Sequence, residues 1–250
     1  MTLQFSPLSH VFLDTADLAA QRGIVEGQLG LRLLATEADP KARHGVVSYD
    51  AGTLIISYNL MSRRQEELPA VLDKLVITFS SAVQRSLPAC DTDGHRYLLV
   101  KGSAGRRPAV TELRLATADL RTSSAFYRDA LGLTLLSRNG HQARFDAGAI
   151  TLVLQHRRDA SADSRRGTYL LVFHTTDIKD CYARLAAQGV AFKSRHIISQ
   201  EFGRTVHFDD PTGHRFCLYE PSASFLTTAP GRKLMQISAG CEGMLPMGFP

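Results

Sequence analysis

Two short stretches of the chain place ionisable and nucleophilic side chains at alternate positions. Glu112 and Arg114 lie two residues apart in a run of leucine and β-branched residues, and Arg215, Cys217 and Tyr219 alternate in a later apolar run. Because successive side chains of a strand point to opposite faces, each set is predicted to share one face of its strand. A carboxylate and arginines among apolar residues suit acid–base chemistry or the binding of an anion.

We expect Glu112 to act as a general base or hydrogen-bond acceptor. Arg114 and Arg215 are expected to bind a carboxylate, phosphate or enolate of a ligand. A purely structural ion pair between Glu112 and one of these arginines is the alternative. Cys217 is a candidate nucleophile with His207 as its base, and a buried, inert thiol is the alternative.

The chain contains an internal repeat that relates these residues to counterparts elsewhere. The segment LDTADL at residues 13–18 returns as LATADL at residues 115–120, and LGLRLL at 29–34 returns as LGLTLL at 131–136, both 102 positions later. Asp-Ala-Gly at 50–52 returns at 146–148, and Gly-His-Arg at 94–96 returns at 213–215. A duplicated half implies that any binding site has an equivalent position with which it can be compared.

Each half is predicted to begin with the same elements. A strand (8–16 or 110–118) precedes a helix that is capped by Asp17 or Asp119 and ended by Gly30 or Gly132. Three strands follow, and the last two form a hairpin around the Asp-Ala-Gly turn. A further unit has a strand at 169–174, a helix at 178–188 capped by Thr176 or Asp177, and strands at 190–194, 205–208 and 215–220. The element order of a unit is therefore βαβββ.

The second unit is shorter than the others. Gly52 and Gly94 are 42 positions apart, whereas Gly148 and Gly213 are 65 apart, so one strand or helix is expected to be missing. We expect an N-terminal domain (1–102), a linker (103–109), a C-terminal domain that carries the functional pocket (110–222), and an extended tail (223–250). The polar stretch 157–167 is either a lid over the pocket or a disordered surface loop.

The composition is ordinary for a globular protein of 250 residues. Lys and Arg number 29 against 24 Asp and Glu, and the net charge of +5 has no long basic run, so we expect no nucleic-acid partner. We find no apolar stretch of membrane-spanning length and no signal peptide, so we expect no membrane partner. The four cysteines lack metal-knuckle spacing, and a chain of this length needs no disulfides for stability, so we expect a reducing, cytoplasmic location.

Two motifs now identify a family resemblance. Phe126-Tyr127 followed by Leu131-Gly132-Leu133, and Phe208-x-Asp210-Pro211-x-Gly213-His214 before an apolar strand, resemble the vicinal oxygen chelate superfamily of glyoxalases, bleomycin-resistance proteins and extradiol dioxygenases. The resemblance spans about residues 8–222. It implies an α+β fold in which tandem βαβββ units form two half-open β-barrels, as in the glyoxalase and extradiol dioxygenase-like fold, with a small organic molecule bound in the cup.

The resemblance also implies where a metal would be held. In metal-dependent members the ligands lie seven residues before the capping Asp and four after the turn glycine. These positions hold His10, Ile56, Leu98, Glu112, Leu152, Leu170 and Cys217. Four of the seven are leucine or isoleucine, which cannot bind a metal. No resident cofactor is therefore expected, with a divalent metal such as Fe, Mn or Zn on the displaced ligands Glu112, His174 and His207 as the alternative.

The function expected from these observations is metal-independent proton chemistry on an anionic or enolic organic substrate, of isomerase, lyase or cyclase type. Leu152, Leu170, His174 and Tyr219 are expected to line the same pocket as the charged groups. Two alternatives remain open: a non-catalytic, antibiotic-like small-molecule binder, and a metal-dependent dioxygenase or glyoxalase-type enzyme. His10 is interpreted as a relic in a filled, structural first half. A homodimer is the expected assembly if the chain associates.

Overall fold

The computed structural model describes residues 8–39, 44–60, 75–81, 91, 93, 95–102, 107–158, 160 and 169–242. Most of the proposed lid at 157–167 lies outside them. The first repeat unit consists of β1 (Leu8–Thr15), α1 (Leu18–Arg22), the π-helical η1 (Gly23–Leu29), β2 (Arg32–Asp39), β3 (His44–Asp50) and β4 (Ile55–Leu60). The shortened second unit contributes β5 (Leu75–Ser81) and β6 (Arg96–Lys101).

The third and fourth units are longer. The third consists of β7 (Ala109–Thr117), α2 (Leu120–Ala125), the π-helical η3 (Phe126–Ala130), β8 (Thr134–Arg138), β9 (Gln142–Asp146) and β10 (Thr151–His156). The fourth consists of β11 (Tyr169–His174), α3 (Ile178–Ala187), β12 (Ile198–Gln200), β13 (Gly203–Asp209) and β14 (Arg215–Pro221). The expected strand at 190–194 is reduced to an isolated bridge between Phe192 and Phe208.

Local capping signals place the helices where the sequence predicts them. The side chain of Asp17 accepts hydrogen bonds from the backbone of Ala19 and Ala20, and Asp119 and Asp177 cap α2 and α3 in the same way. These bonds satisfy backbone N–H groups that have no partner within the helix. Gly30 takes a φ of 69° after η1, a left-handed conformation that favours glycine.

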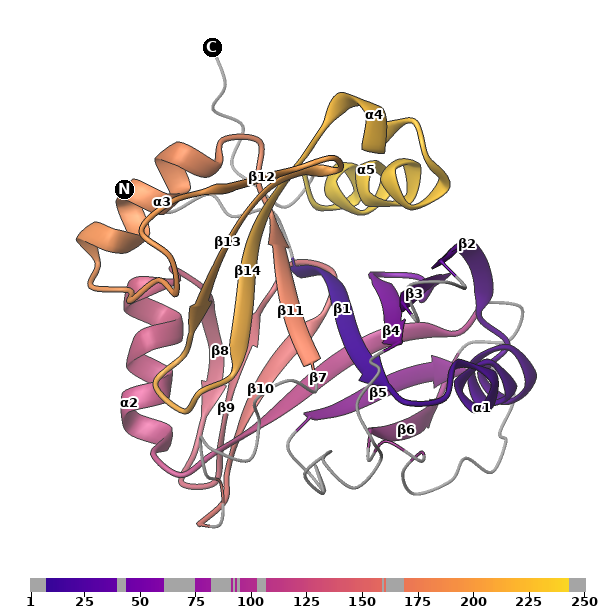
Figure 1. The fold of residues 1–250 in the computed structure, drawn as a ribbon. Coiled ribbons are helices and arrows are strands. Elements are labelled where there is room, and N and C mark those ends of the chain that lie inside the picture. The colour runs from indigo at the N-terminus through magenta and orange to yellow at the C-terminus, as the bar shows by residue number, and fades with distance from the viewer. Residues whose placement is uncertain are drawn as a thin grey trace.

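The strands of the described residues form two sheets that mix the two halves of the chain. Sheet A has the order β12-β13-β14-β11-β1-β4-β3-β2, and sheet B has the order β6-β5-β7-β10-β9-β8. The antiparallel pair β1–β11 joins the first unit to the fourth, and the antiparallel pair β5–β7 joins the second to the third. The cups expected from consecutive halves therefore do not form, and each sheet draws on both sides of the linker (Figure 1).

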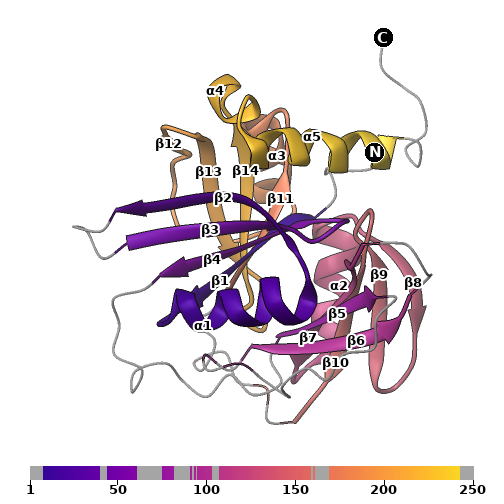
Figure 2. The same cartoon turned by 90° about the vertical axis from the view of Figure 1, so that its right-hand side faces the viewer.

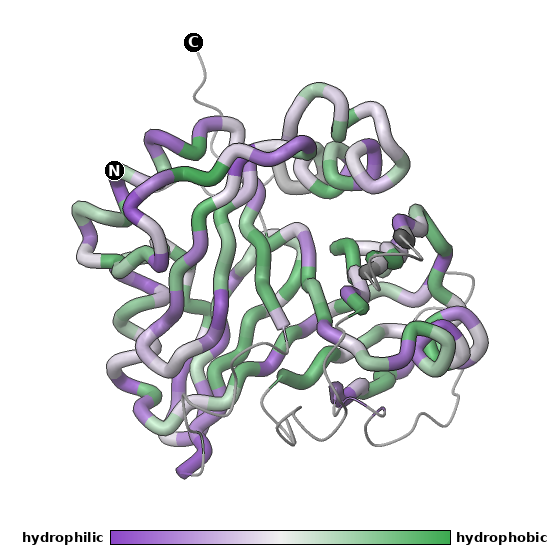
Figure 3. The backbone as a smooth tube through the Cα atoms, viewed as in Figure 1, coloured by the Kyte–Doolittle hydropathy of each residue, from purple (hydrophilic) through white to green (hydrophobic). Residues whose placement is uncertain are grey.

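One face of each sheet contributes to a shared core. On β1, Val11 and Leu13 are fully buried in this core, as are Leu113 and Leu115 on β7. The alternate residues of both strands face the opposite, concave side of their sheet. Helix α1 packs on β4 on the side that faces sheet B (Figure 2), and hydrophobic residues follow the middle of the strands, whereas the connecting turns are more hydrophilic (Figure 3).

The C-terminal segment is helical, so the expectation of an extended tail from residue 223 is wrong. Helices α4 (Ala223–Leu226) and α5 (Ala229–Glu242) lie over the concave face of sheet A (Figure 1). Leu234 and Ile237 of α5 pack on Ile55, and the Lys233 ammonium lies 2.8 Å from Asp50. Pro230 falls in the first turn of α5, where a proline is tolerated, so it does not mark a break. No described helix is both long and apolar enough to cross a membrane.

Replacement of Leu234 by Ala is predicted to destabilise the protein by about 2–5 kcal/mol, because it removes a fully buried side chain between α5 and sheet A. Replacement of Met235 by Ala on the same helix is the matched control, since 48% of that side chain is exposed. It should change the unfolding free energy by less than about 0.5 kcal/mol. Urea denaturation measures both, and equal effects would show that α5 does not dock as described.

Candidate functional site

The concave face of sheet A forms a half-open cavity of about 400 Å³ beneath α4 and α5. Its apolar wall comes from three strands, the turn between β12 and β13 and the two C-terminal helices, and consists of Phe12, Val46, Leu170, Val172, Phe202, Phe225 and Pro230. Its polar groups belong to His10, Glu37, Ser48, Ser57, Gln200, Thr205, His207, Cys217 and Tyr219. A concave, mostly apolar space with a few polar groups is the usual form of a small-molecule site.

His10 is the most constrained polar group of this cavity. It lies on β1 at a local irregularity in the β1–β11 pairing, and only 4% of it is exposed. The Ser9 hydroxyl donates to the carbonyl of Val172 at 3.2 Å and lies 3.0 Å from His10 Nδ1. Because the hydroxyl proton is already used, Ser9 Oγ accepts from Nδ1–H, which leaves Nε2 of His10 as an unprotonated acceptor.

The electrostatic environment keeps this imidazole neutral. Burial lowers the pKa of His10 to about 3, and the neighbouring His174 adds to the effect. Burial also lowers the pKa of His207, with a further contribution from Arg215. Both imidazoles are therefore neutral near pH 7 and present hydrogen-bonding groups without charge.

The Cys217 thiol and the Thr205 hydroxyl in the wall are also uncharged. Burial raises the pKa of the Cys217 thiol to about 12, and the thiol donates to the carbonyl of Leu218. His207 lies directly opposite Cys217 in the β13–β14 ladder, but a thiol that remains protonated is a poor nucleophile. The Thr205 hydroxyl is buried and has no hydrogen-bond partner among the described residues. A ligand that donates to Thr205 or accepts from it would satisfy this group.

Glu112 and Arg114 lie on β7 in sheet B, whereas the strands that line this cavity belong to sheet A. The Glu112 carboxylate is paired with two guanidinium groups, Arg114 at 2.5 Å and Arg144 at 2.7 Å. This arrangement supports the structural ion pair that was the alternative to a catalytic base. Arg215 is exposed beside Lys193 and Asp209 at the end of sheet A, so it cannot join Arg114 in binding one anion.

The expected single site is therefore not formed, and its residues separate into different places. Leu170, His207, Cys217 and Tyr219 line the sheet A cavity. Leu152 is fully buried in the shared core, because the register of β10 differs by one residue from the expectation and turns it to the other face. His174 lies under α5, where its Nδ1 is 3.0 Å from the Ser238 hydroxyl.

Several residues of the cavity were not anticipated from the sequence. His10 was assigned to a filled structural half, yet it lies in the wall of the cavity. Ser57 lines the cavity where Ile56 was expected, and Ile56 faces the core. Phe225 and Pro230 belong to the segment that was expected to be extended. The internal repeat could have indicated that His10 lines a cavity, because His10 is the counterpart of the predicted site residue Glu112, 102 positions later.

The residues at the family's metal positions do not fit a metal centre. In sheet A these positions bring together His10 and Cys217 with Leu170 and Ile56, and neither leucine nor isoleucine can bind a metal. The displaced set of Glu112, His174 and His207 is divided between the two sheets. Among the described residues, the group whose ligand atoms lie within 4.8 Å of one another is Asp91, Asp93 and His95, outside the cavity.

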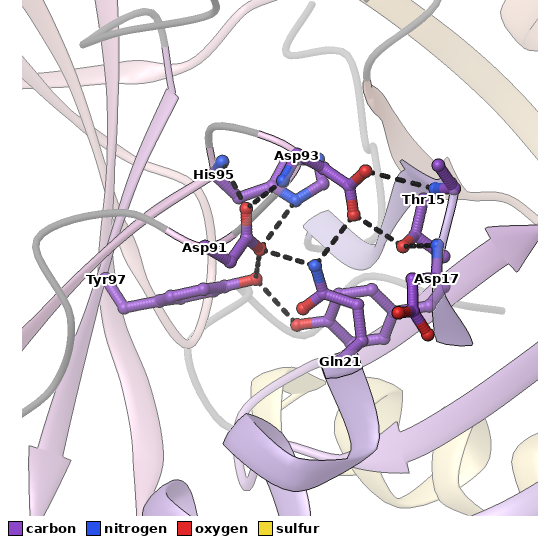
Figure 4. Close-up of polar contacts among 9 residues, drawn as sticks. Thr15, Asp17, Gln21, Asp91, Asp93, His95 and Tyr97 are labelled. Carbon is purple, nitrogen blue, oxygen red and sulfur yellow. Dashed lines mark hydrogen bonds and ion pairs between the residues drawn. The ribbon is translucent and has the colours of Figure 1, made fainter. Parts of the chain in front are cut away.

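This acidic group is part of a hydrogen-bonded turn that the repeat explains (Figure 4). Asp91 Oδ1 accepts from the backbone N–H groups of residues 93 and 95, as Asp210 Oδ1 accepts from those of residues 212 and 214. Burial raises the pKa of Asp91, but His95, with Gln21, outweighs this effect and holds it below its usual value. Asp93 accepts from Thr15 Oγ1, the Ala16 N–H and Gln21 Nε2. We interpret the group as a structural hydrogen-bond network that joins the first unit to the second.

Comparisons with known proteins agree with this fold. Residues 109–218 match the model of the Glyoxalase/Bleomycin resistance protein/Dioxygenase superfamily. Glyoxalase I from Zea mays superposes with a TM-score of 0.66 over 87% of this chain and 92% of its own, at 14% identity. A putative dioxygenase from Bacillus subtilis subsp. subtilis str. 168 superposes with a TM-score of 0.62 over 98% of both chains, at 11% identity.

The superfamily match covers residues 109–218, which hold the third unit and most of the fourth. At these identities the two solved structures show the fold alone, which here extends over both repeats. The expected fold class of tandem βαβββ-like units in two sheets is confirmed.

The buried His10 is predicted to make stability depend on pH. Its pKa is about 3 in the folded protein and near 6.5 in the unfolded chain, so between these values the unfolded chain binds a proton that the folded protein does not. Stability is therefore lost as the pH falls from about 6.5 towards 3. Urea unfolding at pH 7.5 and 5.0 should show a loss that is smaller by about 2 kcal/mol in His10→Gln than in the unmodified protein. An identical loss in both proteins would contradict the burial of a neutral imidazole.

Proposed function

We propose that the protein binds a small, uncharged and largely apolar organic molecule in the sheet A cavity, with His10 as its polar anchor. The observation that carries the proposal is the neutral imidazole of His10, held in one tautomer by Ser9 in a mostly apolar, half-open cavity. The match of residues 109–218 to a superfamily that binds small molecules supports a small molecule as the partner.

The chemistry of the lining favours an uncharged ligand over the anionic substrate expected from the sequence. The inner wall presents imidazole, thiol and hydroxyl groups that carry no charge near neutral pH. Glu37, the carboxylate of the lining, is exposed at the rim. Because burying an ion without a paired charge is costly, an anion would lose more on entering than a neutral molecule of the same shape.

The polar groups also define what the ligand should offer. Nε2 of His10 can accept a hydrogen bond, so a ligand O–H or N–H is the matching group. The unpartnered Thr205 hydroxyl provides a second contact on β13. The aromatic rings of Phe12, Phe202 and Phe225 supply surfaces for a flat apolar body. A phenol or a neutral enol combines these features.

The test uses 2-naphthol, a neutral fluorescent molecule with one O–H donor, titrated against the full chain. Saturable binding is expected in the unmodified protein. Val172→Phe fills the cavity and should abolish binding, and His10→Phe removes the acceptor and should weaken it about tenfold. Leu136→Phe is the control, since that side chain is 54% exposed in sheet B. Unchanged affinity in folded Val172→Phe would refute the proposal.

The residues of this cavity give little support to the proton chemistry expected from the sequence. Glu112 lies in the other sheet. Burial lowers the pKa of His10 to about 3, so its Nε2 accepts hydrogen bonds but is a weak base, poorly suited to removing a proton from carbon.

A further inference from the structure

A second hollow lies on the concave face of sheet B, the counterpart of the cavity in sheet A. It has a volume of about 210 Å³ and is lined by Val76, Arg96, Leu98, Arg114, Gln155 and Arg157. These residues come from the neighbouring strands β6, β5, β7 and β10 and from the residue after β10 (Figure 2). The hollow therefore spans the strands that join the second unit to the third.

The strand register places the arginines of this hollow side by side. Val76 of β5 pairs with Arg96 of β6 on one side and with Arg114 of β7 on the other, so the two arginines lie on the same face with one valine between them. The backbone N–H of Arg157 donates to the carbonyl of Thr117 at 2.8 Å, which fixes the third arginine beside the end of β7.

The lining of this hollow is cationic. Three of the six lining residues are arginines, and none is acidic. The carboxylate of Glu112, two residues from Arg114 on β7, is shared between Arg114 and Arg144. Guanidinium groups that line one hollow can hold a carboxylate or phosphate through charge-assisted hydrogen bonds.

Equivalent positions of the repeat carry side chains of different charge on the two concave faces. Glu112 and Arg114 of β7 occupy the positions that His10 and Phe12 occupy on β1, 102 residues earlier. The face built around His10 and Phe12 is neutral and apolar, whereas the face built around Glu112 and Arg114 is cationic. The two hollows of this fold therefore differ in the charge of the side chains that line them.

We propose that this sheet B hollow is a second binding site, specific for a small organic anion. The carboxylate or phosphate of the ligand is held by Arg96, Arg114 and Arg157. Its apolar part lies against Val76 and Leu98, and 37% of Leu98 is exposed at the edge of the sheet. The site is independent of the sheet A cavity and takes a ligand of different charge.

The test compares benzoate with benzamide, two probes of the same shape that differ in charge, by calorimetric titration of the full chain at low ionic strength. Low salt is used because arginine–anion attraction at a partly exposed site is screened. We expect benzoate to bind and benzamide to bind at least tenfold more weakly. Arg96→Gln and Arg157→Gln should each weaken benzoate about tenfold, and neither replaces an arginine seen to hold Glu112.

Two control variants distinguish binding in this hollow from general charge attraction and from binding in the sheet A cavity. Arg128→Gln removes an exposed arginine on η3 that pairs with Asp129, outside the hollow, and should leave benzoate binding unchanged. Val172→Phe fills the sheet A cavity and should also leave it unchanged. The proposal is overturned if Arg96→Gln and Arg157→Gln bind benzoate normally, if Arg128→Gln weakens binding equally, or if Val172→Phe abolishes it.

Discussion

The antiparallel pairing of β1 with β11 is the contact on which the rest of the structure depends. It joins the first repeat unit to the fourth and makes one continuous sheet from strands more than 150 residues apart in sequence. Through this ladder His10 lies beside Val172, and through the next ladder Val172 lies beside Cys217. Without it, the wall of the sheet A cavity would be divided between two separate surfaces.

Strand alternation then gives each sheet two distinct roles. Val11 and Leu13 of β1 and Leu113 and Leu115 of β7 lie in one shared core, which ties the two sheets together. The alternate residues His10, Phe12 and Arg114 line the two hollows and differ between the repeats. Because the core side is constrained by close packing and the concave side is not, duplication of this unit leaves two concave faces with different side chains on one scaffold.

The turns that follow Asp91 and Asp210 hold these units in place. Each aspartate caps its own turn through backbone N–H groups, and each also accepts a hydrogen bond from the helix of the unit before it, Gln21 for Asp91 and Tyr127 for Asp210. Buried carboxylates are stable in such positions because every oxygen has a donor. The repeated use of this contact shows why a cluster of acidic residues can be structural.

The repeat is visible in the sequence alone, and so are the caps at Asp17, Asp119 and Asp177, the Asp-Ala-Gly turns and the alternation of side chains on β1, β7 and β14. The caps, turns and alternation depend on hydrogen bonds and periodicities within about ten residues of the chain, which the local sequence specifies. The family resemblance, carried by two such local motifs, therefore gave the correct fold class. It also placed Leu170 and Cys217 on the face that lines a cavity.

Only the tertiary structure decided which units share a sheet, and this separated Glu112 from Cys217 and brought His10 into the cavity. Open strand edges of similar units can pair in more than one way, and the choice depends on contacts between residues far apart in the chain. The same reason applies to the one-residue difference in register that turned Leu152 and Ile56 to the core. Helix α5 was not predicted because its stability comes from the packing of Leu234 and Ile237 on sheet A. The sequence of the helix alone does not show that contact.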